Sequence, residues 1–176
     1  METGNGQPAS DPSLGTTKCL KSSSKDKPIV QYALMVDAGS TGSRIHVYRF
    51  NNCGDTPELE HEEFKMTKPG LSSFKEDAEG AARSLDELLE VAMKSVPEKL
   101  KSCTPIAVKA TAGLRLLGDQ LSKNILDAVR RRLETEYPFP IIEKGGVEIM
   151  DGSDEGGCCA FTSSPSPEKG YHNGVC

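Results

Sequence analysis

The chain has 176 residues, of which 36% are hydrophobic and 27% charged, and its formal net charge is −5. This length suffices for one compact domain, or for one domain and part of a second. The acidic balance argues against nucleic-acid binding, which requires clustered Lys and Arg. The three consecutive arginines at 130–132 lie among acidic residues and are interpreted as a solvated helix face. No apolar run reaches the roughly 18 residues that span a membrane, so we expect neither a signal peptide nor an anchor in this chain.

The first half of the chain predicts a disordered leader and three strands. Residues 1–31 are rich in Gly, Ser, Thr, Pro and Lys and have almost no apolar periodicity, which is typical of disorder. Residues 32–37 form a short apolar run that ends in a Gly-rich turn, as a buried strand does. Residues 44–50 alternate apolar and polar side chains and are expected to form a hairpin with that strand. The charged stretch 58–66 indicates a third strand at the sheet edge.

The second half alternates helices and strands. Residues 76–96 carry apolar side chains at helical spacing and are followed by Pro97, which ends the helix. Strands are expected at 105–110 and 147–150, with a second long helix at 119–136 between them. The order β-β-β-α-β-α-β indicates an α/β fold with a mixed sheet. Together with the glycines and hydroxyls in the first turn, it is the order of one lobe of the actin-like (ribonuclease-H-like) ATPase fold.

The first polar loop, DAGSTGSR, directly follows the first predicted strand. Its glycines, Gly39 and Gly42, permit backbone conformations with φ above zero and leave room for a phosphate. Backbone N–H groups in such a turn point inward and bind anions, and the hydroxyls of Ser40 and Thr41 are further donors. The alternative is an ordinary hairpin turn, although a two-residue turn needs only a dipeptide such as Asn-Gly. The loop lacks the GxxxxGK[ST] pattern, so it is not a Walker A loop.

Two further residues at strand ends, one acidic and one with a hydroxyl group, indicate a metal site. Asp37 ends the first predicted strand and is placed to hold a divalent cation through water, because Mg²⁺ keeps much of its hydration shell. The second polar loop, in KATAGLRLL, places Thr111 at a strand end and Arg115 shortly after it. The Thr111 hydroxyl can orient a metal-bound water. The alternative is a plain strand-to-helix connection with Thr111 near the helix cap.

The third polar loop, MDGSDEG (150–156), carries three carboxylates in five residues. One of them can act as a general base if it is held within hydrogen-bond reach of an attacking water. The alternative for this loop alone is a solvated acidic turn. Ligands of open α/β sheets bind at the carboxyl ends of strands, where all three loops lie. Their coincidence favours one shared site.

The six cysteines do not form a zinc-binding pattern, because there is no CxxC and the histidines are scattered. Cys53 and Cys103 each fall in a loop-like segment of the predicted domain. A disulfide between them is one interpretation, and two unrelated thiols are the other.

The three loops together resemble a known family. VDAGSTGSRIHVYRF, VKATAGLRLLG and IMDGSDEG are similar to the first three apyrase-conserved regions of the nucleoside di- and triphosphate hydrolases, which include ecto-apyrases and Golgi nucleoside diphosphatases. The stretches between them, such as KPGLSSF and YPFP, resemble the fungal Golgi guanosine diphosphatases. The resemblance covers residues 32–156, which we expect to be the N-terminal lobe of such an enzyme.

The resemblance implies hydrolysis of a terminal phosphate by an activated water, with Ca²⁺ or Mg²⁺ as cofactor and Mn²⁺ as an alternative. It implies that Asp37 and Thr111 hold the metal through water, that Glu155 is the general base, and that Arg115 belongs to the site. An oxidising lumen, where the family works, favours the Cys53–Cys103 disulfide. The phosphate is expected to contact the first loop, at Gly39, Ser40, Thr41, Gly42 and Ser43.

By the same resemblance the substrate is a nucleoside diphosphate, GDP and also UDP, and the reaction supports protein glycosylation in the Golgi lumen. The fourth and fifth regions of the family are not recognised in this chain, and the resemblance assigns the base pocket to the second lobe that they build. Residues 157–176 diverge from the family and are expected to be a disordered tail. The competing hypothesis is therefore a non-catalytic fragment that binds phosphate weakly at most.

Overall fold

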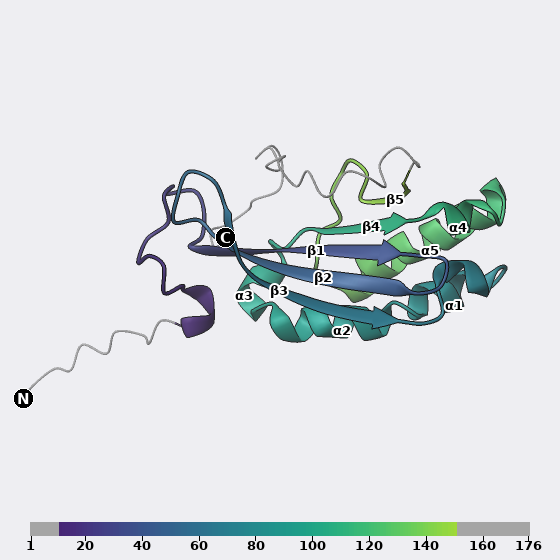
Figure 1. Cartoon of the computed structure of the whole chain (residues 1–176), viewed down its shortest axis with the longest axis horizontal. Helices are drawn as coiled ribbons and strands as arrows, with labels where there is room; N and C mark the ends of the chain where they lie inside the picture. Colours follow the sequence, from purple (N-terminus) through teal and green to yellow (C-terminus); the bar gives the residue numbers. More distant parts are fainter. Residues whose placement is uncertain (1–10, 151–176) are drawn as a thin grey trace, which may run out of the picture.

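The computed structural model describes residues 11–150, and its core is a single mixed sheet with the strand order β3-β2-β1-β4-β5 (Figure 1). The first two strands form the predicted antiparallel hairpin, β3 pairs antiparallel to β2 at one edge, and β4 and β5 continue the sheet in parallel on the other side. The predicted edge position of the third strand is therefore confirmed. The strands are β1 (Val30–Ala38), β2 (Ser43–Asn51), β3 (Glu58–Thr67), β4 (Ile106–Ala110) and β5 (Val147–Ile149).

The main helices pack against one face of the sheet (Figure 1). The predicted helix over 76–96 is divided in two, because the helical hydrogen-bond pattern is interrupted at Ser84 and Leu85. The second long helix has the predicted bounds, and its buried stripe includes Ile125, Val129 and Leu133. The helical elements are η1 (Pro12–Leu14), η2 (Leu71–Phe74), α1 (Ala78–Arg83), α2 (Asp86–Ser95), α3 (Glu98–Lys101), α4 (Ala112–Arg115) and α5 (Asp119–Glu136).

Strand β1 shows how the sheet faces are used. Leu34 and Val36 are fully buried beneath the helices, whereas Met35 and Asp37, which alternate with them, are only partly buried. This alternation follows from the two-residue period of a strand. Because β1, β4 and β5 run parallel to one another, their carboxyl ends lie at the same end of the sheet. None of the helices among residues 11–150 is long and apolar enough to cross a membrane.

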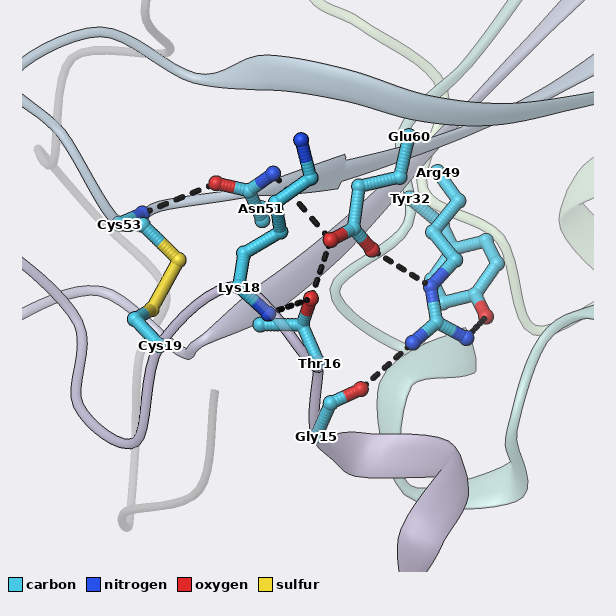
Figure 2. A network of polar contacts seen from close by, with 9 residues as sticks. All are labelled: Gly15, Thr16, Lys18, Cys19, Tyr32, Arg49, Asn51, Cys53 and Glu60. Carbon is cyan, nitrogen blue, oxygen red and sulfur yellow. Dashed lines mark hydrogen bonds and ion pairs between the residues drawn. A yellow bond between two sulfur atoms is a disulfide. The ribbon is translucent and has the colours of Figure 1, made fainter.

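The prediction of a disordered leader over residues 1–31 is wrong for residues 11–31. Residues 30 and 31 begin β1, and residues 11–29 lie against the sheet end opposite the first polar loop (Figures 1 and 2). A disulfide joins Cys19 to Cys53, with an S–S distance of 2.05 Å and Cα atoms 5.8 Å apart. The predicted Cys53–Cys103 pair is therefore wrong, and Cys103 is itself disulfide-bonded. Cys53 follows the end of β2 that the leader covers, which is why its partner is in the leader.

Glu60 is the centre of a polar network under the leader (Figure 2). A β-bulge in β3 leaves Glu60 without a register partner, and the carboxylate turns toward Arg49 on β2. It accepts hydrogen bonds from Arg49 Nε at 3.3 Å, from Asn51 Nδ2 at 3.2 Å and from the Thr16 hydroxyl. Burial raises the pKa of Glu60, but these donors outweigh that effect and hold the pKa below its usual value.

Arg49 completes the network with its remaining donors (Figure 2). Its guanidinium donates to the Gly15 carbonyl at 2.6 Å and to the Tyr32 hydroxyl at 3.1 Å, and it lies 5.9 Å from the centre of the Tyr32 ring. The leader thus provides both a backbone acceptor to Arg49 and a side-chain donor to Glu60. The leader also packs Leu14 and Ile29 against the core. These two apolar residues are far apart in the sequence, and its other contacts are polar groups and a disulfide, so the leader has no apolar periodicity.

Candidate functional site

The first polar loop has a defined geometry. Strands β1 and β2 pair as far as Ala38 and Ser43, so the loop proper consists of residues 39–42. Its ends are closed by the Gly39 N–H, which donates to the Gly42 carbonyl at 2.9 Å. We name residues 39–42 the phosphate loop, after the role that its composition predicts. The side chains of Ser40 and Thr41 are exposed at its tip.

The glycines of the phosphate loop serve a different purpose from the one expected. Among the described residues, the glycines with positive φ are Gly118 and Gly145, so neither Gly39 nor Gly42 uses left-handed backbone freedom. A Cβ on Gly42 would instead lie 2.6 Å from the carbonyl oxygen of Thr67, and one on Gly39 would lie 3.0 Å from that of Gly42. Close backbone packing therefore requires glycine at position 42 and leaves little room for a side chain at position 39.

Ser43 differs from the other predicted phosphate-binding residues. It pairs with Ala38 on the helix-covered face, is 1% exposed, and its hydroxyl has no hydrogen-bond partner among the described residues. The hydroxyl is therefore not open to solvent as those of Ser40 and Thr41 are. A buried hydroxyl without a partner is uncommon and directly adjoins the phosphate loop.

Asp37 lies in a row of alternating charges that crosses four strands on the open face of the sheet. Its register partners are Arg44 on β2 and Lys109 on β4, and Lys109 in turn pairs with Glu148 on β5. The Arg44 guanidinium is 3.6 Å from the Asp37 carboxylate, and the Lys109 ammonium contacts Glu148. Opposite charges on neighbouring strands attract each other, so Asp37 pairs with Arg44 while Lys109 on the other neighbouring strand pairs with Glu148.

Arg44 is a site residue that the sequence-based prediction omitted. It is half exposed beside the phosphate loop and places a permanent positive charge there. The sequence could have indicated Arg44, because a hairpin loop of four residues after Ala38 places Asp37 and Arg44 directly opposite each other.

Thr111 joins the second polar loop to the first. Its backbone N–H donates to the Ala38 carbonyl at 3.0 Å, which places the start of α4 next to the phosphate loop. Thr111 occupies the N-cap position, but its side chain makes no capping hydrogen bond. The capping alternative therefore does not account for the hydroxyl. Within residues 11–150, no three His, Cys, Asp or Glu side chains gather as a metal cluster.

Arg115 connects the second loop to the beginning of the third. Its guanidinium donates to the Met150 carbonyl at 2.6 Å, and the Met150 N–H donates to the Ala110 carbonyl at 2.8 Å. All three loops thus begin at one edge of the sheet, as predicted. Glu155 and the tail 157–176 lie outside the described residues, so the positions predicted for them remain predictions.

Comparison with known proteins gives one family and several close relatives. The model of the GDA1/CD39 (nucleoside phosphatase) family matches residues 23–161. The chain is 69% identical to a "Probable guanosine-diphosphatase" of Aspergillus fumigatus over 159 residues, and 61% identical to the "Guanosine-diphosphatase" of Saccharomyces cerevisiae over 126 residues. These matches cover 86% and 72% of this chain, but only 31% and 24% of the relatives. The chain spans less than a third of the length of these relatives.

A solved structure supports the fold. The crystal structure of nucleoside triphosphate hydrolases from Neospora caninum matches with a TM-score of 0.53 at 17% identity, over 72% of this chain and 30% of that one. At this identity the match concerns the fold alone, and it agrees with one lobe of the actin-like architecture predicted from the order of elements. The described residues include the first two polar loops of that fold and Met150, at which the third loop begins.

Proposed function

Because the chain belongs to the GDA1/CD39 (nucleoside phosphatase) family, we propose that it is the phosphate-loop lobe of a nucleoside diphosphatase. The observation that carries the proposal is the convergence of the phosphate loop, Asp37 and Thr111 at one sheet edge, in a chain 69% identical to a guanosine-diphosphatase. The reaction converts a nucleoside diphosphate and water into a nucleoside monophosphate and inorganic phosphate.

The phosphate loop binds the terminal phosphate of the substrate. Backbone N–H groups at its tip and the exposed hydroxyls of Ser40 and Thr41 are the donors, and Arg44 supplies positive charge at its side. Arg115 contributes by holding the start of the third loop at Met150. Catalysis of phosphoryl transfer depends mainly on positioning and on neutralising charge, and these groups serve both purposes.

The donor set fits a hydrated Ca²⁺ or Mg²⁺. Asp37 provides one carboxylate whose side chain is 34% exposed, and the Thr111 hydroxyl is nearby without a capping role. A magnesium ion in a phosphate site is commonly held by one or two carboxylates and several waters, so a cluster of three acidic side chains is not needed. When bound, the cation would neutralise charge on the phosphates. Asp37 and Thr111 would orient its waters.

Glu155 is the general base in this proposal. It accepts a proton from the attacking water as the water oxygen bonds to the terminal phosphorus, while the bond from phosphorus to the bridging oxygen breaks and the nucleoside monophosphate leaves. Its position in the third loop, five residues after Met150, supports the assignment, since that loop begins beside Ala110 and Arg115.

The names of the fungal relatives favour GDP, and UDP is proposed as a second substrate. The disulfides at Cys19–Cys53 and Cys103 favour an oxidising compartment of the secretory pathway, because the cytosol keeps thiols reduced. We propose that this compartment is the Golgi lumen. There, hydrolysis of the GDP left by glycosyl transfer supports glycosylation.

A second candidate function follows from the small share of its relatives' length that the chain spans. It is a lobe that binds phosphate without turning over substrate. The chain spans 31% of its Aspergillus fumigatus relative. In an oxyanion site, loss of one donor costs about 3 kcal/mol of transition-state stabilisation, so half of a cleft would lose most of its rate enhancement.

The two candidates differ in phosphate release from GDP, UDP and ADP in the presence of Ca²⁺ or Mg²⁺. The test compares the chain with Glu155→Gln and with Glu143→Gln, a matched removal of charge from an exposed carboxylate. Metal-dependent release that Glu155→Gln abolishes and Glu143→Gln preserves supports the enzyme. Equal background release in all three proteins supports the non-catalytic lobe.

A further inference from the structure

Gly70 lies against the phosphate loop and has no conformational reason to be glycine. Its φ of −74° and ψ of 165° are accessible to any residue. Space is the restriction, because a Cβ on Gly70 would lie 2.2 Å from the Gly39 carbonyl oxygen and 2.6 Å from that of Ser40. The segment after β3 therefore touches the backbone of the phosphate loop directly.

Gly113, on a second segment, also approaches the phosphate loop closely. It lies within α4, where glycine is less favourable than alanine. A Cβ on Gly113 would lie 2.5 Å from the Ser40 Cβ and 3.2 Å from the Ser40 Cα. The close approach to Ser40 explains why a helix position carries the residue that least favours helix.

Ser40 is consequently enclosed by two segments from distant parts of the chain. Gly70 lies close to the Ser40 carbonyl, and Gly113 lies close to the Ser40 Cβ. The Ser72 hydroxyl donates a hydrogen bond to the Ser40 carbonyl at 3.3 Å. The first segment follows β3 and the second follows β4. Two segments thus contact the phosphate loop at Ser40, while the side chains of Ser40 and Thr41 remain exposed.

We propose that Gly70 and Gly113 are positioning residues for the phosphate loop, with Ser72 as an accessory contact. They hold Ser40 so that the loop N–H groups keep one anion-binding arrangement before a phosphate arrives. This proposal rests on the proposed phosphate-binding function of the loop. An added methyl group on either glycine would displace the loop by roughly 1 Å, and misplacement on that scale can lower catalytic efficiency about 100-fold.

The test uses amide NMR spectra of the ¹⁵N-labelled chain and orthophosphate titrations in the presence of Ca²⁺. The variants are Gly70→Ala, Gly113→Ala and Ser72→Ala. The control is Gly54→Ala in the loop between β2 and β3, where the nearest atom to an added Cβ is the Thr56 carbonyl oxygen at 4.0 Å. Thermal unfolding of each variant reports any loss of global stability.

We expect Gly70→Ala and Gly113→Ala to shift the amide signals of residues 39–42 and to weaken orthophosphate binding at least tenfold. Ser72→Ala should shift the Thr41 amide signal, because the Ser40 carbonyl belongs to the same peptide group, and it keeps the proposal testable if either glycine variant fails to fold. Gly54→Ala should leave both measurements unchanged. The proposal is overturned if the loop signals of the folded glycine variants, or of Ser72→Ala when they do not fold, coincide with those of the parent chain. If the parent does not bind orthophosphate, the proposed function fails, while the loop signals still decide the positioning role.

Discussion

The two ends of the β1–β2 hairpin are held in place by different means. At the turn, close backbone contacts through Gly42, Gly70 and Gly113 fix the phosphate loop. At the opposite end, the Arg49–Glu60 network and a disulfide attach the leader to the sheet. Backbone packing leaves polar side chains exposed for a ligand, whereas the network uses its polar groups for one another. We therefore expect stability to depend more on the leader end and chemistry on the turn end.

The largest loss of stability is expected from the double substitution Cys19→Ser and Cys53→Ser. The disulfide closes a loop between residues 34 apart in sequence, and removing such a constraint costs about 4 kcal/mol of unfolding free energy. Urea unfolding measures the loss, and each single substitution should cost about as much as the double one. Movement of the amide signals of residues 39–42 in the double variant would contradict the independence of the two ends.

Glu60→Ala should cost about 2 kcal/mol, because it removes the acceptor of three hydrogen bonds and leaves Arg49 without its ion-pair partner. The control is Glu58→Ala on the same strand, whose ion pair with Lys18 is largely exposed and should contribute less than about 1 kcal/mol. Equal losses in urea unfolding would show that the network does not stabilise the leader end.

We expect the Glu60 network to make the stability of the chain fall at acid pH. The pKa of Glu60 is lower in the folded chain than in the unfolded one, so the unfolded state binds more protons as the pH falls below about 4. The stabilising contribution is complete above the unfolded pKa and is lost as the pH falls through the folded one. Burial raises the pKa of Asp86, but hydrogen bonds from Arg132 and Tyr137 outweigh burial and hold this pKa below its usual value. Asp86 therefore also loses its stabilising contribution as the pH falls. Glu60→Gln should flatten the acid limb of the curve but not abolish it; an unchanged limb would contradict the assignment.

The smallest effect on stability is expected from Asp37→Asn. The carboxylate is partly exposed and 3.6 Å from Arg44, an arrangement that contributes no more than about 0.5 kcal/mol. The same substitution should abolish the Ca²⁺ dependence of orthophosphate binding. A large loss of stability with intact metal dependence would reverse the roles that we assign to the two ends.

Much of the fold was predictable because its signals are local. The alternation in β1 and β2 and the stripe of Ile125, Val129 and Leu133 in α5 are written in the spacing of apolar residues. The docking of the leader was not predictable, because Thr16 and Gly15 bind through a hydroxyl and a backbone carbonyl, which leave no periodic pattern. The disulfide was misassigned because sequence spacing contains no distance between Cys53 and its partner.

The candidate site was predictable in part for similar reasons. The strand-end positions of Asp37 and Thr111 followed from the order of elements, and the structure places both beside the phosphate loop. The reason for Gly42 was missed, since this glycine is required by the nearby Thr67 carbonyl on another segment rather than by a positive φ. Register arithmetic across the hairpin could have added Arg44.

The most direct test of the division between the two ends is to map where orthophosphate binds. The ¹⁵N-labelled chain is titrated with orthophosphate in the presence of Ca²⁺, and the backbone amide shifts are followed. We expect shifts in residues 39–43 and 111–113 and none in residues 15–19 or 51–54. Shifts confined to the leader end, or none in a chain with a folded spectrum, would contradict it.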